Sequence, residues 1–136
     1  MRYNLFIGRY QSPHKGHMHI FDTFLKEEKP VLIAIRDIEP DDANPLPAAE
    51  VKLLWEKVYA DNALVKVIII PDIASVNYGR GVGYEVNEIS VGEAVASISA
   101  TEIRRQIMEG ENDWKTLVDK SIHDILSSFL KSKIPM

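Results

Sequence analysis

Residues 3–25 of the chain read YNLFIGRYQSPHKGHMHIFDTFL. The apolar run at residues 3–7 is typical of a short buried strand, and residues 16–26 place apolar side chains at helical spacing. The residues between them form a strand-to-helix turn that carries two histidines with a glycine between them. Such turns bind phosphates in α/β sheets, because the helix start presents N–H groups and a partial positive charge. This stretch therefore indicates an α/β fold and an anion site.

The alternation of strands and helices continues through the first half of the chain. Residues 31–35 and 65–70 are short apolar runs that predict buried strands, and residues 47–58 predict a helix between them. Buried strands that alternate with helices predict parallel pairing with right-handed crossovers. We therefore expect a Rossmann-like, doubly wound α/β sheet in one compact domain over residues 1–136.

The second half of the chain has a different pattern. Residues 77–84 are rich in glycine and predict a loop, and residues 84–91 predict a further short strand. A helix is expected over residues 101–109, with Gly110 as its stop signal. A last amphipathic helix is expected over residues 114–131.

Composition narrows the class of protein. The 136 residues carry a net charge of −4, which argues against the basic face of a general nucleic-acid binder. The absence of cysteine excludes disulfides and thiolate metal sites. No apolar stretch is long enough to span a bilayer, and the first residues do not read as a signal peptide. We expect a cytoplasmic protein with no nucleic-acid or membrane partner.

His14 and His17 are the first candidates for chemistry. An imidazole can donate a hydrogen bond to a phosphate oxygen, Gly16 lets phosphates approach the backbone, and Arg9 adds a planar fork of donors. One alternative is a pair of surface histidines in a polar turn. The other is a metal site, but the nearby Asp22 lies inside the helix and no third ligand is evident, so no protein-built metal site is expected.

A second candidate anion site lies at residues 98–105, ISATEIRR. Ser99 or Thr101 is expected to cap the start of a helix, with Glu102 in its first turn. Arg104 follows Thr101 by one helical turn, so both side chains can face the same ligand. The alternative is a capped helix whose arginines are solvated.

Together, GRYQSPHKGH at residues 8–17 and ISATEIRR at residues 98–105 resemble the His-x-Gly-His nucleotidyltransferase superfamily, which is cytidylyltransferase-like in fold. Within it, the chain most resembles the archaeal-type nicotinamide-nucleotide adenylyltransferases. These share a Gly-Arg-aromatic-Gln opening and a Thr-Glu-Ile-Arg-Arg helix start. Residues 44–50 and 108–114 are also similar to theirs.

The resemblance implies transfer of AMP from ATP to a small phosphate-bearing acceptor, such as nicotinamide mononucleotide, with release of pyrophosphate. It also implies Mg²⁺ bridging the substrate phosphates, largely through water and substrate. The alternative within the same class is transfer from CTP to a phosphorylated alcohol such as glycerol 3-phosphate. The alternative outside the class is a non-catalytic nucleotide-binding regulatory module. Relatives are often dimers or larger, so a homo-oligomer is a further expectation.

The resemblance also implies roles for individual residues. The catalytic candidates are His14, His17 and Arg104, with His17 best placed to stabilise charge that develops at the α-phosphate. The nucleotide-binding candidates are Gly8, Arg9, Tyr10, Gly16, Ser99, Thr101 and Arg104.

Three residues are candidates for binding the acceptor. Arg36 follows the second strand, where ligands bind in open α/β sheets. Arg80 and Gly81 belong to a glycine-rich run that can cradle a phosphate, the alternative being a flexible turn. The alternative partners for Arg36 are Asp37, Glu39 and Asp41.

Overall fold

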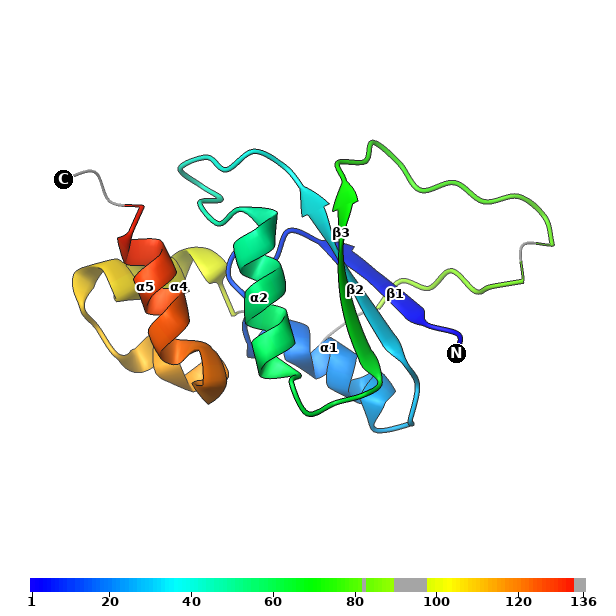
Figure 1. Ribbon diagram of the computed structural model, residues 1–136, viewed down its shortest axis with the longest axis horizontal. Coiled ribbons are helices and arrows are strands. Elements are labelled where there is room, and N and C mark those ends of the chain that lie inside the picture. Colours follow the sequence, from blue (N-terminus) through cyan, green and yellow to red (C-terminus); the bar gives the residue numbers. More distant parts are fainter. Residues whose placement is uncertain (82, 90–97, 134–136) are drawn as a thin grey trace.

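The computed structural model describes residues 1–81, 83–89 and 98–133. Within these ranges a three-stranded parallel sheet has the order β1-β2-β3 (Figure 1). Helix α1 (Lys15–Leu25) joins the first two strands, and helix α2 (Ala48–Val58) joins the second and third. The strands are β1 (Asn4–Gly8), β2 (Val31–Asp37) and β3 (Val65–Pro71). The predicted Rossmann-like α/β architecture, with parallel strands alternating with helices, is confirmed.

Helices α1 and α2 pack on the same face of the sheet. Phe6, Ile33 and Val67 are in register across the three strands, and Phe6 makes edge-on ring contacts with Phe21 and Phe24 of α1. Two successive right-handed crossovers in the same direction place both helices on one side. The loop that follows β3 projects from the other side (Figure 1).

The opposite face of the sheet carries Leu5, which is 54% exposed. In the described part of the chain no helix covers this face. The expected homo-oligomer stays a prediction. No helix within the described ranges is long and apolar enough to cross a membrane.

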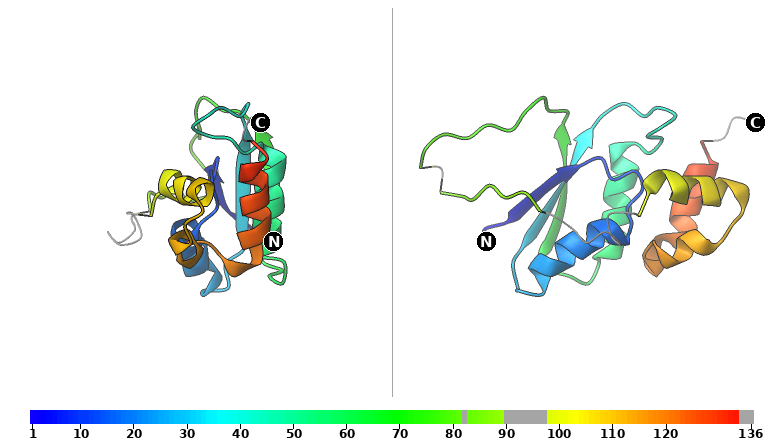
Figure 2. Two further views of the ribbon diagram at one scale, coloured as in Figure 1. Left: turned by 90° about the vertical axis from the view of Figure 1, so that its left-hand side faces the viewer. Right: turned by 180° about the vertical axis from the view of Figure 1, so that it is seen from behind.

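Helices α4 (Ala100–Glu109) and α5 (His123–Lys131) complete the described chain. Ile103 of α4 and Leu126 of α5 are fully buried in the same core as Trp55 of α2. This packing brings the start of α4 beside the turn between β1 and α1 (Figure 2). The two candidate anion sites, far apart in sequence, therefore meet in space.

The single helix predicted over residues 114–131 is wrong. The segment contains two 3₁₀ turns, η1 (Asp113–Thr116) and η2 (Lys120–Ile122), before α5 begins. Asp119 interrupts the pattern because its carboxylate accepts a hydrogen bond from the Ser121 N–H at 3.1 Å. Such local side-chain bonds compete with helical hydrogen bonding.

The strand predicted over residues 84–91 is also absent over its described residues, 84–89. Residues 84–89 form no strand, and residues 90 and 91 lie outside the described ranges. Tyr84 and Val86 are 55% and 60% exposed, so their β-forming side chains bury little surface here. A strand gains stability from packing on its neighbours, which these side chains lack.

Candidate active site

The turn between β1 and α1 is organised by the two histidines themselves. The His14 Nδ1 accepts a hydrogen bond from the Gly16 N–H at 3.0 Å, and the His17 Nδ1 accepts one from the His14 N–H at 3.1 Å. The two rings stack with centroids 3.8 Å apart. Because each Nδ1 is an acceptor, this pattern assigns the proton of each neutral ring to Nε2.

Both imidazoles are uncharged at neutral pH. Burial lowers the pKa of His14 to about 4. Burial, together with the charge of a protonated His14, lowers the pKa of His17 to about 3. Among the described residues neither Nε2 has a hydrogen-bond partner, so the turn offers two neutral N–H donors to a ligand.

The backbone N–H groups at the start of α1 are largely occupied. The Lys15 N–H donates to the Leu117 carbonyl oxygen at 2.8 Å, and the Gly16 N–H donates to His14. The sequence led us to expect these groups to be free for phosphate, and that expectation is wrong for both residues. The Leu117 carbonyl and the His14 side chain occupy these two N–H groups, and the imidazole Nε2 groups remain as donors at this turn.

Gly8 and Tyr10 form the support behind His17. A Cβ at Gly8 would lie 3.0 Å from the Tyr10 ring, a contact so tight that the ring would have to shift. The Tyr10 ring meets His17 and Trp55 edge-on, with centroids 5.0 and 5.5 Å away. Burial raises the pKa of the Tyr10 hydroxyl. Both residues thus hold His17 in place, and their direct contact with a nucleotide stays a prediction.

The start of α4 supplies the second half of the site. Ser99 caps the helix, as predicted, because its Oγ accepts from the Glu102 N–H at 3.3 Å. Among the described residues the N–H groups of Ala100 and Thr101 have no partner. The Arg104 Nη2 donates to Thr101 Oγ1 at 3.3 Å, so the two side chains share one side of the helix. Backbone donors, a hydroxyl and a guanidinium therefore converge here, which suits an anion.

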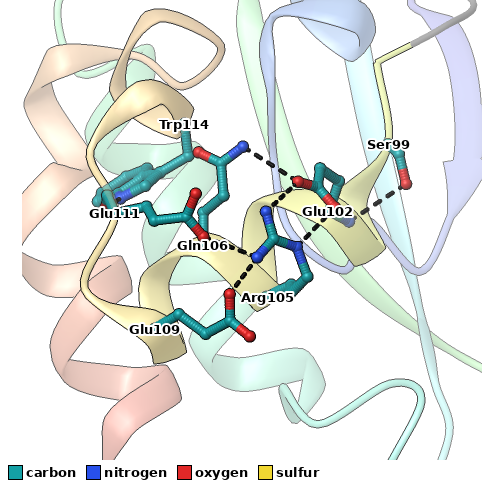
Figure 3. A network of polar contacts seen from close by, with 7 residues as sticks. All are labelled: Ser99, Glu102, Arg105, Gln106, Glu109, Glu111 and Trp114. Carbon is teal, nitrogen blue, oxygen red and sulfur yellow. Dashed lines mark hydrogen bonds and ion pairs between the residues drawn. The ribbon is translucent and has the colours of Figure 1, made fainter.

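Arg104 and its neighbour Arg105 have different surroundings. Arg105 is bound by three carboxylates, with Glu102 at 2.5 Å, Glu111 at 2.7 Å and Glu109 closing the group (Figure 3). Hydrogen bonds from Arg105 and from Gln106 lower the pKa of Glu102 to about 2. Arg104 instead reaches the β1–α1 turn, where its Nη1 donates to the backbone carbonyl of Gln11. The second arrangement places a cation that pairs with no carboxylate among the described residues at the β1–α1 turn, the turn that carries both histidines.

Arg36 lies at the carboxyl end of β2 but is already paired. Its guanidinium donates to Asp72 Oδ1 from Nη2 at 2.8 Å and from Nε at 3.2 Å. This partner follows β3 and is none of the three carboxylates weighed from the sequence. Arg36 also lines a cavity of about 290 Å³ with Ile7 and residues 73–76. The cavity lies at the sheet edge where ligands of α/β proteins bind.

The remaining candidates are Arg9, Arg80 and Gly81. The Arg9 Nη2 donates weakly to the Glu39 carbonyl oxygen at 3.4 Å. Arg80 and Gly81 belong to the exposed loop after β3, which projects away from α4 (Figure 1). The structure therefore does not bring Arg80 and Gly81 to the histidines, and their role in acceptor binding stays a prediction.

Sequence reasoning assigned no role to Gln11, although it belongs to the Gly-Arg-aromatic-Gln opening. Its side-chain Nε2 donates to the Leu46 carbonyl oxygen at 2.6 Å, and its Oε1 accepts from the Leu46 N–H at 2.8 Å. The only signal in the sequence is its place in that opening. The partner, 35 residues away, appears only in the folded chain.

Fold and site together describe an α/β protein in which a strand-to-helix turn with two histidines lies beside a helix start that carries a hydroxyl and an arginine. No family model matches the chain. It is 26% identical to nicotinamide-nucleotide adenylyltransferase of Pyrococcus furiosus, over 93% of this chain and 83% of that protein. The protein of the same name from Pyrobaculum neutrophilum is 26% identical, over 94% of this chain and 89% of that protein. The one from Pyrobaculum arsenaticum is 24% identical, over 90% of this chain and 85% of that protein. The expected resemblance to archaeal nicotinamide-nucleotide adenylyltransferases is confirmed, and the cytidylyl and non-catalytic alternatives are not favoured.

Proposed function

We propose that the protein is a nucleotidyltransferase that transfers AMP from ATP to nicotinamide mononucleotide and releases pyrophosphate. The observation that carries the proposal is the pair of neutral imidazoles, each with its Nδ1 engaged by a backbone N–H, beside the start of α4. Two Nε2–H donors and one guanidinium suit a polyphosphate. The names of the relatives support the choice of nucleotide and acceptor.

The reaction needs positioning and charge stabilisation more than proton transfer. An oxygen of the acceptor phosphate forms a bond to the α-phosphorus, and the bond between that phosphorus and the bridging oxygen to the β-phosphate breaks. Pyrophosphate leaves with the electron pair. The acceptor phosphate is already ionised at neutral pH, so no general base is needed. In such transfers the protein mainly neutralises developing charge.

Each half of the site has a role in this proposal. His14 and His17 donate to the triphosphate, with His17 at the α-phosphate, where negative charge develops. The burial that keeps both rings neutral leaves their Nε2–H groups as donors across the physiological pH range. Ser99, Thr101 and Arg104 hold the β- and γ-phosphates that leave.

A divalent cation fits this site only with help from the substrate. Within the described ranges no group of three or more His, Asp or Glu side chains is placed to hold a metal ion. We propose that Mg²⁺ is bound through phosphate oxygens and water, a form of binding this cation favours. Bound there, it would neutralise phosphate charge.

The acceptor is proposed to bind near Arg36. The cavity beside Arg36 lies at the carboxyl ends of the strands, and its lining consists of this guanidinium, Ser75 and apolar side chains. A phosphate that approaches Arg36 would share the guanidinium with Asp72 or replace it.

A matrix of nucleoside triphosphates against phosphorylated acceptors, assayed as pyrophosphate release with Mg²⁺, tests the proposal. We expect the highest rate with ATP and nicotinamide mononucleotide. Release with CTP and not ATP would overturn the adenylyl assignment, and no release with any pair would overturn the enzymatic function. His17→Ala should lower kcat on the order of 100-fold, the loss typical of removing a donor at a developing charge. The matched control is His19→Ala, an exposed histidine on the same helix, which should keep the full rate.

A further inference from the structure

The Gln11 side chain joins two loops that flank the site. The residue is only 8% exposed, and its carboxamide binds both the N–H and the carbonyl oxygen of Leu46. It pairs with Leu46 much as a neighbouring β-strand would. The β1–α1 turn is thereby tied to the loop that leads into α2.

The main chain of Gln11 is the acceptor for Arg104. With its side chain held by Leu46, the Gln11 carbonyl oxygen has a fixed position and accepts from Arg104 Nη1. The Arg104 Nη2 is held by Thr101 Oγ1. A guanidinium is planar with five N–H donors, so fixing two of its nitrogens also fixes the direction of the remaining N–H groups.

We infer that Gln11 is a positioning residue that orients Arg104 toward the leaving phosphates. This inference rests on the proposed function. Without the carboxamide, the β1–α1 turn loses its attachment to Leu46, and the Gln11 carbonyl can shift away from Arg104. The guanidinium then loses the acceptor that sets its direction, although its charge remains. Binding and catalysis suffer through geometry, because small displacements of charged groups are costly in an active site.

The variant Gln11→Met tests this inference, because methionine has a similar length and apolar bulk but makes neither hydrogen bond to Leu46. We expect its kcat/KM for ATP to fall on the order of 10- to 100-fold. The matched control is Asn62→Ala. It also removes a side-chain carboxamide that binds a backbone N–H, that of Leu64 at 3.0 Å, but it does so before β3, at the other end of the strand from Asp72. The control should lose stability and keep kcat/KM.

A double-mutant cycle separates positioning from a general structural role. In an Arg104→Ala background, Gln11→Met should change kcat/KM by less than about twofold, because the group through which it acts is gone. Most of its effect on the urea midpoint should remain in that background, because the two bonds to Leu46 do not involve the Arg104 side chain. The loss of activity is thus expected to depend on Arg104, whereas most of the loss of stability is not.

A ligand-free measurement keeps the inference separate from the proposed function. In the wild type, ¹⁵N spectra should show slow rotation of the Arg104 guanidinium, since Nη1 and Nη2 are both held. In Gln11→Met the rotation should become fast. This readout stands even if the wild type turns over no ATP, a result that would refute only the proposed function. If Gln11→Met does not fold, Gln11→Leu, which also makes neither hydrogen bond to Leu46, takes its place in every measurement.

Two results would overturn the inference. One is unchanged rotation of the Arg104 guanidinium in the variant. The other, in an active enzyme, is a kcat/KM loss from Gln11→Met that is equally large with and without Arg104.

Discussion

Acidification should destabilise the protein well above the pH at which its carboxylates titrate. The ordinary histidine pKa is 6.5, and burial lowers it to about 4 for His14 and about 3 for His17 in the folded chain. The unfolded chain therefore takes up protons first as the pH falls below 6.5. The stability that depends on neutral histidines is full above that pH and is lost on the way down to pH 3–4.

The size of the effect follows from linkage. Between pH 8 and pH 5, a histidine with an unfolded pKa of 6.5 and a folded pKa of 4 or below loses about 2 kcal/mol of folding free energy. The two histidines together lose about 4 kcal/mol, a large part of the stability of a small domain. Glu102 does not contribute to the loss of stability between pH 8 and pH 5. Its pKa falls from 4.5 to about 2 on folding, so its contribution is lost only below pH 4.5.

Urea unfolding between pH 8 and pH 5 measures this loss, and two variants assign it. His17→Phe keeps an aromatic ring against Tyr10 and Trp55 but binds no proton. It should lower stability at pH 8, because the His14 N–H loses its acceptor, and should roughly halve the pH dependence. The control His19→Gln changes an exposed histidine and should leave the dependence as in the wild type. Equal stability at pH 8 and pH 5, or an unchanged slope in His17→Phe, would refute the reasoning.

Three further predictions follow from single contacts. Gly8→Ala should destabilise the protein by about 1–3 kcal/mol in thermal unfolding, because the new Cβ meets the Tyr10 ring; an unchanged midpoint would show that the ring can move. Gly110→Ala should cost about 1 kcal/mol in urea unfolding, because Gly110 ends α4 with φ of 75°; a stabilised variant would contradict this. Arg36→Gln should raise the KM for nicotinamide mononucleotide about tenfold and leave that for ATP unchanged, since its charge-assisted bond is worth about 1.5–3 kcal/mol. An equal rise in both KM values, measured by pyrophosphate release, would place Arg36 outside the acceptor site.

The local elements of the first half of the chain were predictable, since each depends on neighbouring residues. The apolar run before Gly8 and the helical spacing after Gly16 specify β1 and α1. Ser99 and Gly110 mark the ends of α4 as predicted. The prediction failed over residues 114–131, where spacing alone favoured one helix but the structure has two 3₁₀ turns, the second capped by the Asp119 side chain, before α5 begins.

What the sequence alone determined is the identity of the chemical groups: two histidines at a strand-to-helix turn, and a hydroxyl and an arginine at a helix start. Only the tertiary structure decided which donors those groups offer. Burial keeps both imidazoles neutral, and their Nδ1 atoms are occupied by backbone N–H groups. A hydrogen bond to the Gln11 carbonyl, 93 residues away, ties Arg104 to the β1–α1 turn, while Arg105 beside it pairs with glutamates. Burial and long-range contacts depend on the whole packed core, so spacing along the chain could not reveal them.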